Sequence, residues 1–253
     1  MKEKKLKKNE NNLICELLYM NIYQIPLLTY FISSIVLIIL FFKSFKNKKK
    51  PLFLPQISQT GMKNINIISY FIYFISFTII SAITGLFYIN EIHIENKPYI
   101  TKLIIILGII GCLLNILQGY ISLDMNKKLH ELTAYGGIFI HLITLSIYLY
   151  YVNIKDDNSD NSDKENYQKY MEICIRFAWL SIILLFPLFM SRTYYYLNKS
   201  KSKNKKFFTT FYYSLGSLSQ RGCIFFLLLA LFIYGYYKVG NSNKYFISLY
   251  KDK

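Results

Sequence analysis

Long apolar segments separated by short polar stretches make up most of this chain. Six of them are each long and apolar enough to cross a membrane as a helix, namely residues 22–42, 67–89, 100–121, 132–152, 171–194 and 208–237. A crossing helix needs about 20 mostly apolar residues, and lipid admits helices because each one satisfies its own backbone hydrogen bonds. We therefore predict an all-α fold, a polytopic six-transmembrane-helix bundle whose membrane domain covers residues 22–239.

The polar stretches define the rest of the predicted organisation. Residues 1–21 form a basic N-terminal segment and residues 240–253 form a tail, and an even number of crossings places both on one side. Loops one (residues 43–66), three (122–131) and five (195–207) then share the opposite face. Residues 153–170 are rich in Asp, Asn, Ser and Lys without apolar periodicity, which predicts a disordered loop. Pro187 predicts a kink in the fifth helix.

Composition and charge support a membrane protein and exclude nucleic-acid binding. The chain is 53% apolar and 17% charged, with a net charge of +16. Its lysines lie in short clusters beside the apolar segments, at residues 4–8, 46–50 and 199–206, where they suit contact with anionic lipid headgroups and form no continuous basic face for a duplex. The 30 Lys and Arg residues divide evenly between the two sides. The positive-inside rule therefore does not choose an orientation.

Loop one contains a short segment with the chemistry of a defined turn. Pro55, Ile57, Ser58, Thr60 and Gly61 lie within seven residues, which we call the loop-one turn (residues 55–61). Proline fixes φ, Gly61 permits a positive φ, and the two hydroxyls can cap the second helix or bind an anion. Residue chemistry favours a turn at a helix entry over a ligand site.

Three histidines raise the question of a haem site. His130 opens the fourth span beside Glu131, and His141 lies eleven residues further along the same helix. Haem ligated by two histidines needs a partner on another helix, and the remaining histidine, His93, lies in loop two. We therefore predict no cofactor and expect His141 to be a packed side chain hydrogen-bonded between helices.

Gln220 and Arg221 interrupt the apolar sequence of the sixth span. An arginine inside a membrane helix is costly enough to suggest a function, whereas a long stem that reaches the headgroups is the structural alternative. Helix parity places Arg221, His130, Glu131 and the loop-one turn toward the same membrane face. This convergence makes them the candidate ligand-binding or partner-binding residues.

Small residues and isolated cysteines complete the candidate chemistry. Gly108 and Gly111 in the third span permit close approach of a neighbouring helix, so we assign them to helix packing. The four cysteines have no spacing typical of a metal site or a disulfide framework. Motifs typical of catalytic sites are also missing from the sequence, which predicts a protein that is not an enzyme.

The segment Leu54-Pro55-Gln56-Ile57-Ser58-Gln59-Thr60-Gly61 resembles the Pro-x-Ile-Ser-Asp-Thr-Gly motif of the damage-regulated autophagy modulator (DRAM) family. That family consists of six-span proteins and is grouped with phosphatidylinositol 4-kinase regulators and GPI-anchor remodelling proteins. Gly108, Gly111 and Cys112, with His130 eighteen residues after that cysteine, extend the resemblance. It covers residues 51–237 and implies a cytoplasmic N-terminus and a luminal or extracellular loop one.

The chain departs from the family pattern at three places. Gln59 stands where the family has an acidic residue, Tyr120-Ile121-Ser122 replaces an Asn-Phe-Gln sequence, and Gln220-Arg221 replaces a Glu-Trp pair. If the family's acidic residues contact a ligand, these changes alter that contact.

The resemblance implies a non-enzymatic protein that organises lipids or recruits a membrane or kinase-complex partner in autophagy or phosphoinositide signalling. It favours lysosomal, vacuolar or other endomembranes over the plasma membrane. A small transporter or lipid scramblase, with Arg221 and His130 lining a polar path, is one alternative. A GPI-anchor lipid remodelling factor, in which a luminal histidine assists acyl chemistry, is another.

Overall fold

The computed structural model describes residues 2–45, 53–94, 96–153 and 162–251, and these residues are almost entirely helical. The helices are α1 (Lys2–Ser44), α2 (Ile57–Thr60), α3 (Ile67–Glu91), α4 (Pro98–Tyr120), α5 (Lys127–Asn153), α6 (Ser162–Trp179), α7 (Phe186–Asn198) and α8 (Lys205–Lys251). A π-helical turn, Leu180–Leu185, joins α6 to α7. The lysine clusters at residues 4–8 and 46–50 lie outside the described side chains.

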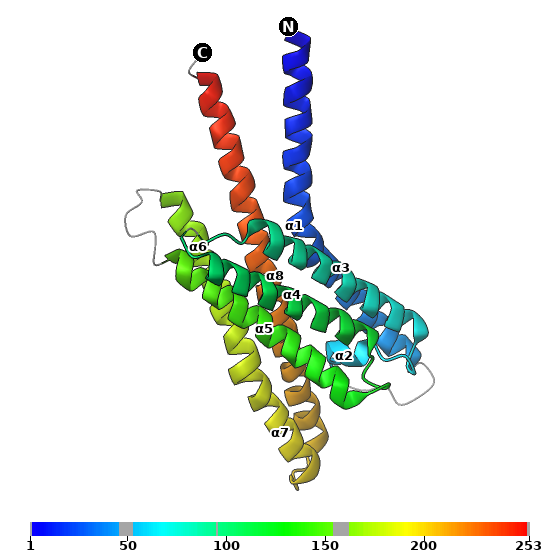
Figure 1. Cartoon of the computed structure of the whole chain (residues 1–253). Helices are drawn as coiled ribbons and strands as arrows, with labels where there is room; N and C mark the ends of the chain where they lie inside the picture. The colour runs from blue at the N-terminus through cyan, green and yellow to red at the C-terminus, as the bar shows by residue number, and fades with distance from the viewer. Residues whose placement is uncertain (1, 46–52, 95, 154–161, 252–253) are drawn as a thin grey trace.

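Six segments are long and apolar enough to cross a membrane, which confirms the predicted all-α bundle. They are Gln24–Ser44, Ile67–Glu91, Pro98–Tyr120, Lys127–Val152, Tyr167–Asn198 and Lys205–Tyr237. The ends differ from the predicted ends by up to five residues, most at the fourth and fifth crossings, because polar and aromatic residues extend those helices past the apolar stretch. Both chain ends lie at the same end of the bundle (Figure 1).

The helices form two crossed groups. Helices α3, α4 and α5 lie side by side in chain order, and α8 crosses behind them (Figure 1). Helix α8 also contacts α1, α6 and α7, so it is the element shared by most of the bundle. The short helix α2 of loop one contacts α1, α3 and α8. This position places the loop-one turn against the middle of the last membrane helix.

The prediction of a disordered loop over residues 153–170 is wrong for residues 162–170, which are helical. Helix α6 begins at Ser162, whereas residues 154–161 lie outside the described residues. The ring of Tyr167 stacks on Tyr237 with centroids 3.8 Å apart, and Met171 is fully buried. Tertiary contact with α8 therefore stabilises a helix whose first residues are polar.

A kink is expected at Pro187, and the structure has a π-helical turn, Leu180–Leu185, just before this residue. The backbone N–H of Phe186 donates to the carbonyl of Ser181, five residues earlier, and Pro187 follows in the first turn of α7. Proline lacks an N–H and its ring crowds the preceding turn. A wide turn at this point accommodates the proline without ending the helix.

Gly108 and Gly111 of α4 lie against aromatic rings from the two neighbouring helices. A Cβ atom at Gly108 would lie 2.4 Å from the Cγ of Tyr88 on α3, and one at Gly111 would lie 3.0 Å from the His141 ring on α5. Tyr88 is fully buried and His141 is 6% exposed. The glycines thus permit close packing on two sides of α4, through ring-to-backbone contact.

We expect Gly108→Ala to destabilise the bundle, because the new methyl group meets the base of a fully buried ring. Overpacking of this kind costs about 1–3 kcal/mol, which should appear as a lower midpoint of thermal unfolding in detergent or nanodiscs. The matched control is Gly85→Ala, where the nearest atom to the new Cβ lies 3.7 Å away on a flexible isoleucine. Equal midpoints for the two variants would contradict the assigned packing role.

Candidate functional site

The loop-one turn is a folded element whose hydroxyl groups face inward. Ile57, Ser58 and Thr60 are all buried, and the hydroxyl of Thr60 donates to the carbonyl of Ile57 at 2.6 Å. The backbone N–H of Gln56 donates to the side chain of Gln59 at 3.2 Å, which closes the turn. Gln59, which stands where the related motif has an acid, therefore has a local role in closing this turn.

Gly61 has a different role from the one the sequence suggested. Its φ is −94°, so the turn does not use the positive φ that glycine permits. A Cβ at this position would lie 2.4 Å from the Cγ of Tyr73, which is fully buried on α3. Glycine is needed because a ring packs directly on the backbone. The loop hydroxyls do not cap α3 either, since the side chain of Asn66 accepts from the N–H groups of Ile68 and Ser69.

Three polar side chains of α8 hold loop one against the bundle. The hydroxyl of Ser217 donates to the carbonyl of Pro55 at 2.6 Å, and Nη2 of Arg221 donates to the same oxygen at 3.0 Å. One turn earlier, the hydroxyl of Ser214 accepts from the N–H of Leu54 at 3.0 Å. The spacing of Ser214, Ser217 and Arg221 places all three on one face of α8, and this spacing is visible in the sequence.

Arg221 is inside the bundle, which rules out a side chain that reaches the headgroups. The residue is 8% exposed, and the hydroxyl of Tyr30 on α1 donates to its backbone carbonyl at 2.8 Å. Its Nε and Nη1 atoms are buried without a hydrogen-bond partner among the described residues. Oε1 of Gln220 is likewise buried without a partner in the same part of the chain.

His130 belongs to the same region, whereas Glu131 does not. The imidazole of His130 is 1% exposed, its Nδ1 lies 2.6 Å from the carbonyl of Ile121, and its ring centroid lies 6.4 Å from that of Tyr73. Tyr73 in turn packs on Gly61 and accepts a hydrogen bond from Gln118 at 2.7 Å. Glu131 lies on the outside of α5, with its carboxylate 3.8 Å from the Lys127 ammonium.

Asp124, which sequence reasoning missed, ties loop three to loop one. Its two carboxylate oxygens accept the backbone N–H groups of Lys63 at 3.1 Å and Asn64 at 2.8 Å. Slight burial acts to raise the pKa of this carboxyl, but the Ser122 hydroxyl and the N–H groups of Asn64, Asp124 and Lys63 favour the ionised form and hold the pKa below its usual value. These hydrogen bonds therefore stabilise the ionised form of the Asp124 carboxylate.

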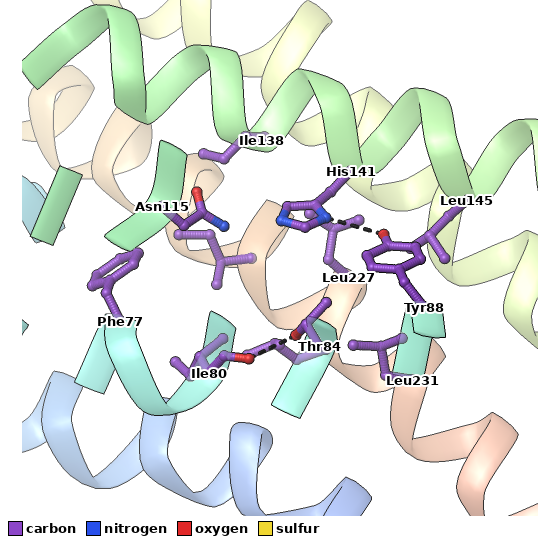
Figure 2. A pocket seen from close by; sticks show the side chains of 12 residues that line it. Phe77, Ile80, Thr84, Tyr88, Asn115, Ile138, His141, Leu145, Leu227 and Leu231 are labelled. Carbon is purple, nitrogen blue, oxygen red and sulfur yellow. Dashed lines mark hydrogen bonds between the residues drawn. The ribbon is translucent and has the colours of Figure 1, made fainter. Parts of the chain in front are cut away.

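A cavity of about 40 Å³ lies between α3, α4, α5 and α8 (Figure 2). Its walls are mainly leucine and isoleucine side chains, with polar groups from Thr84, Tyr88, Asn115 and His141. The hydroxyl of Tyr88 lies 3.0 Å from Nδ1 of His141, which confirms that this histidine is packed and hydrogen-bonded between helices. The cavity has room for a few water molecules. Nδ1 of His141 is already engaged by the Tyr88 hydroxyl.

A family model described as the Frag1/DRAM/Sfk1/Cwh43P N-terminal domain matches residues 15–237. The match includes all six crossings, the loop-one turn and the three polar side chains of α8. No curated protein and no solved structure matches the chain.

We expect Asp124→Asn to loosen loop one and to remove a pH-dependent contribution to stability. Because the folded-state pKa is depressed, the wild-type carboxylate stabilises the fold above its ordinary value of about 4 and loses this effect as the pH falls through the folded-state pKa. The group is exposed, so the loss should be about 1 kcal/mol or less.

The measurement is the thermal unfolding midpoint of wild type and Asp124→Asn from neutral pH down to pH values below the ordinary carboxyl range. The difference between the two proteins should be constant in neutral and mildly acidic buffer and should vanish at the acid end. Glu131→Gln, on an exposed carboxylate of the neighbouring helix, is the control. A difference that already disappears in mildly acidic buffer would contradict a depressed pKa.

Proposed function

This chain belongs to the Frag1/DRAM/Sfk1/Cwh43P family, and on that basis we propose that it acts without catalysis as a multi-pass membrane protein that organises lipids or recruits a partner in autophagy or phosphoinositide signalling. The observation that carries this proposal is the docking of loop one on α8. Two donors, Ser217 and Arg221, converge on the carbonyl of Pro55. The two donors thereby position loop one on one face of the bundle, where it can take part in recognition of a lipid or partner.

The geometry favours this proposal over the two alternatives. A solute transporter needs polar groups along a path through the bundle, whereas the cavity between α3, α4, α5 and α8 has mainly apolar walls and room for a few waters. A histidine that assists acyl chemistry must reach its substrate, whereas His130 is 1% exposed and its Nδ1 is engaged by the Ile121 carbonyl.

A knockout-rescue experiment tests the function. We expect the double variant Ser217→Ala with Arg221→Gln to lose most of the rescue of autophagic flux and of phosphatidylinositol 4-phosphate levels, because loop one loses both donors that hold it on α8. Arg192→Gln, an exposed arginine on α7, is the matched control and should rescue fully. Full rescue of every readout by the double variant, at wild-type expression, would refute the proposal.

The family also suggests where the protein acts. We expect an epitope inserted in loop one to be luminal, and a C-terminal tag to be cytosolic, in lysosomal or other endomembranes. Antibody access in selectively permeabilised cells with organelle markers measures both properties together. A cytosolic epitope in loop one would show that the topology implied by the family does not apply, and plasma-membrane staining would refute the compartment.

A further inference from the structure

Arg221 carries a positive charge that the described part of the protein does not neutralise. The ion pairs of Lys127 with Glu131 and of Arg176 with Glu172 lie on outer helix faces, away from Arg221 in the sequence. Arg221 has one hydrogen bond from its guanidinium, to the neutral carbonyl of Pro55, while Nε and Nη1 are buried and unpaired within the described residues. A buried charge with unpaired donors costs several kcal/mol as a rule, so a partner for this guanidinium is energetically favoured.

The oxygen that Arg221 now contacts is held in a way that suits an anion. Ser217 and Arg221 both donate to the Pro55 carbonyl, at 2.6 Å and 3.0 Å, so a hydroxyl and a guanidinium converge on one oxygen atom. Hydroxyl and guanidinium donors are the groups that bind phosphate oxygens, and hydrogen bonds from an ionised donor are stronger when the acceptor is also charged. A phosphate oxygen in this place would gain more from the two donors than the neutral carbonyl does.

The lipid bilayer is the source of such an anion that the position of Arg221 favours. The residue lies within the crossing segment Lys205–Tyr237 and donates to Pro55, so it is on the side of the bundle where loop one joins α1 to α3. A phospholipid brings its phosphate to this depth with its acyl chains in the surrounding hydrocarbon. Arg221 is buried and its Nη2 atom is bonded to the Pro55 carbonyl, so binding in the place of that oxygen requires that the turn move off α8.

We propose that Arg221 and Ser217 form a phosphate-binding site for an anionic phospholipid, which displaces the carbonyl of Pro55 and releases the loop-one turn from α8. The inference rests on the proposed function and names the class of lipid that the protein recognises. In this proposal loop one has two states, one docked on α8 and one released from it. Binding of the lipid shifts the equilibrium between them toward the released state. A ligand changes such a balance only through its different affinity for the two states.

The test measures release of the loop-one turn in the purified full chain. Ser58 is 8% exposed in the docked turn, so Ser58→Cys reports its release through reaction with a membrane-impermeant maleimide. Cys112, Cys174 and Cys223 are buried, and Cys15→Ser removes the remaining thiol. The probes are short-chain phosphatidic acid, short-chain phosphatidylcholine and inorganic phosphate, each titrated into the detergent-solubilised protein.

We expect phosphatidic acid to accelerate labelling in a saturable way and phosphatidylcholine to have no effect. Arg221→Gln should weaken the apparent affinity for phosphatidic acid roughly ten- to hundredfold, which corresponds to the loss of one charge-assisted hydrogen bond. The control Arg192→Gln should titrate like wild type. If Arg221→Gln does not fold, Ser217→Ala provides the comparison, with a several-fold weaker affinity expected.

Three results would overturn the inference. Labelling that does not respond to phosphatidic acid would show that there is no such site, and equal titrations for Arg221→Gln and Arg192→Gln would show that Arg221 does not form it. An equal response to inorganic phosphate would show that the ligand is a free oxyanion, against the lipid assignment. Because the assay uses no cells, a lipid response without any rescue defect in the double variant would instead refute the proposed function and leave the site intact.

Discussion

Close approach between backbones and aromatic rings is the constraint on which this bundle depends. Helices in lipid gain little hydrophobic energy by packing together, because the acyl chains are as apolar as the side chains, so dispersion contacts at small residues decide which faces meet. Gly108 and Gly111 let rings from α3 and α5 lie against α4, and Gly61 does the same for a ring of α3. The same contact that assembles the α3, α4 and α5 layer therefore also places the loop-one turn.

Several buried hydroxyl groups are satisfied within their own helix, which sets them apart from the buried polar groups that are not. The hydroxyls of Ser76, Thr84 and Thr144 each donate to the carbonyl four residues earlier in their own helix. Tyrosines instead reach across helices, as Tyr30 does from α1 to α8. The guanidinium of Arg221 follows neither pattern, since it belongs to a membrane helix but uses a loop carbonyl. A side chain that local geometry cannot satisfy is the expected mark of a functional position.

Sequence reasoning recovered what hydropathy and helix parity determine, and missed what distant contacts determine. The six crossings follow from apolar length, and Arg221 stood out because arginine is rare in such a segment. The role of Gly61 depends on the position of Tyr73 on another helix, so local turn chemistry gave the wrong reason for it. Asp124 looked like an ordinary loop residue because its acceptor role appears only when loops one and three meet. The first turns of α6 were missed because their partner, α8, lies seventy residues away in the chain.

The π turn before Pro187 sets the rotational phase of one crossing. A turn with an extra residue rotates everything that follows by about 100° relative to an uninterrupted α-helix. Helix α6 packs against α5 and α8, whereas α7 continues along α8, where Phe186 and Thr193 are buried. In a continuous α-helix those two side chains would lie about 100° around the helix axis from their present positions. The wide turn thus lets a single crossing present two differently oriented faces to its neighbours.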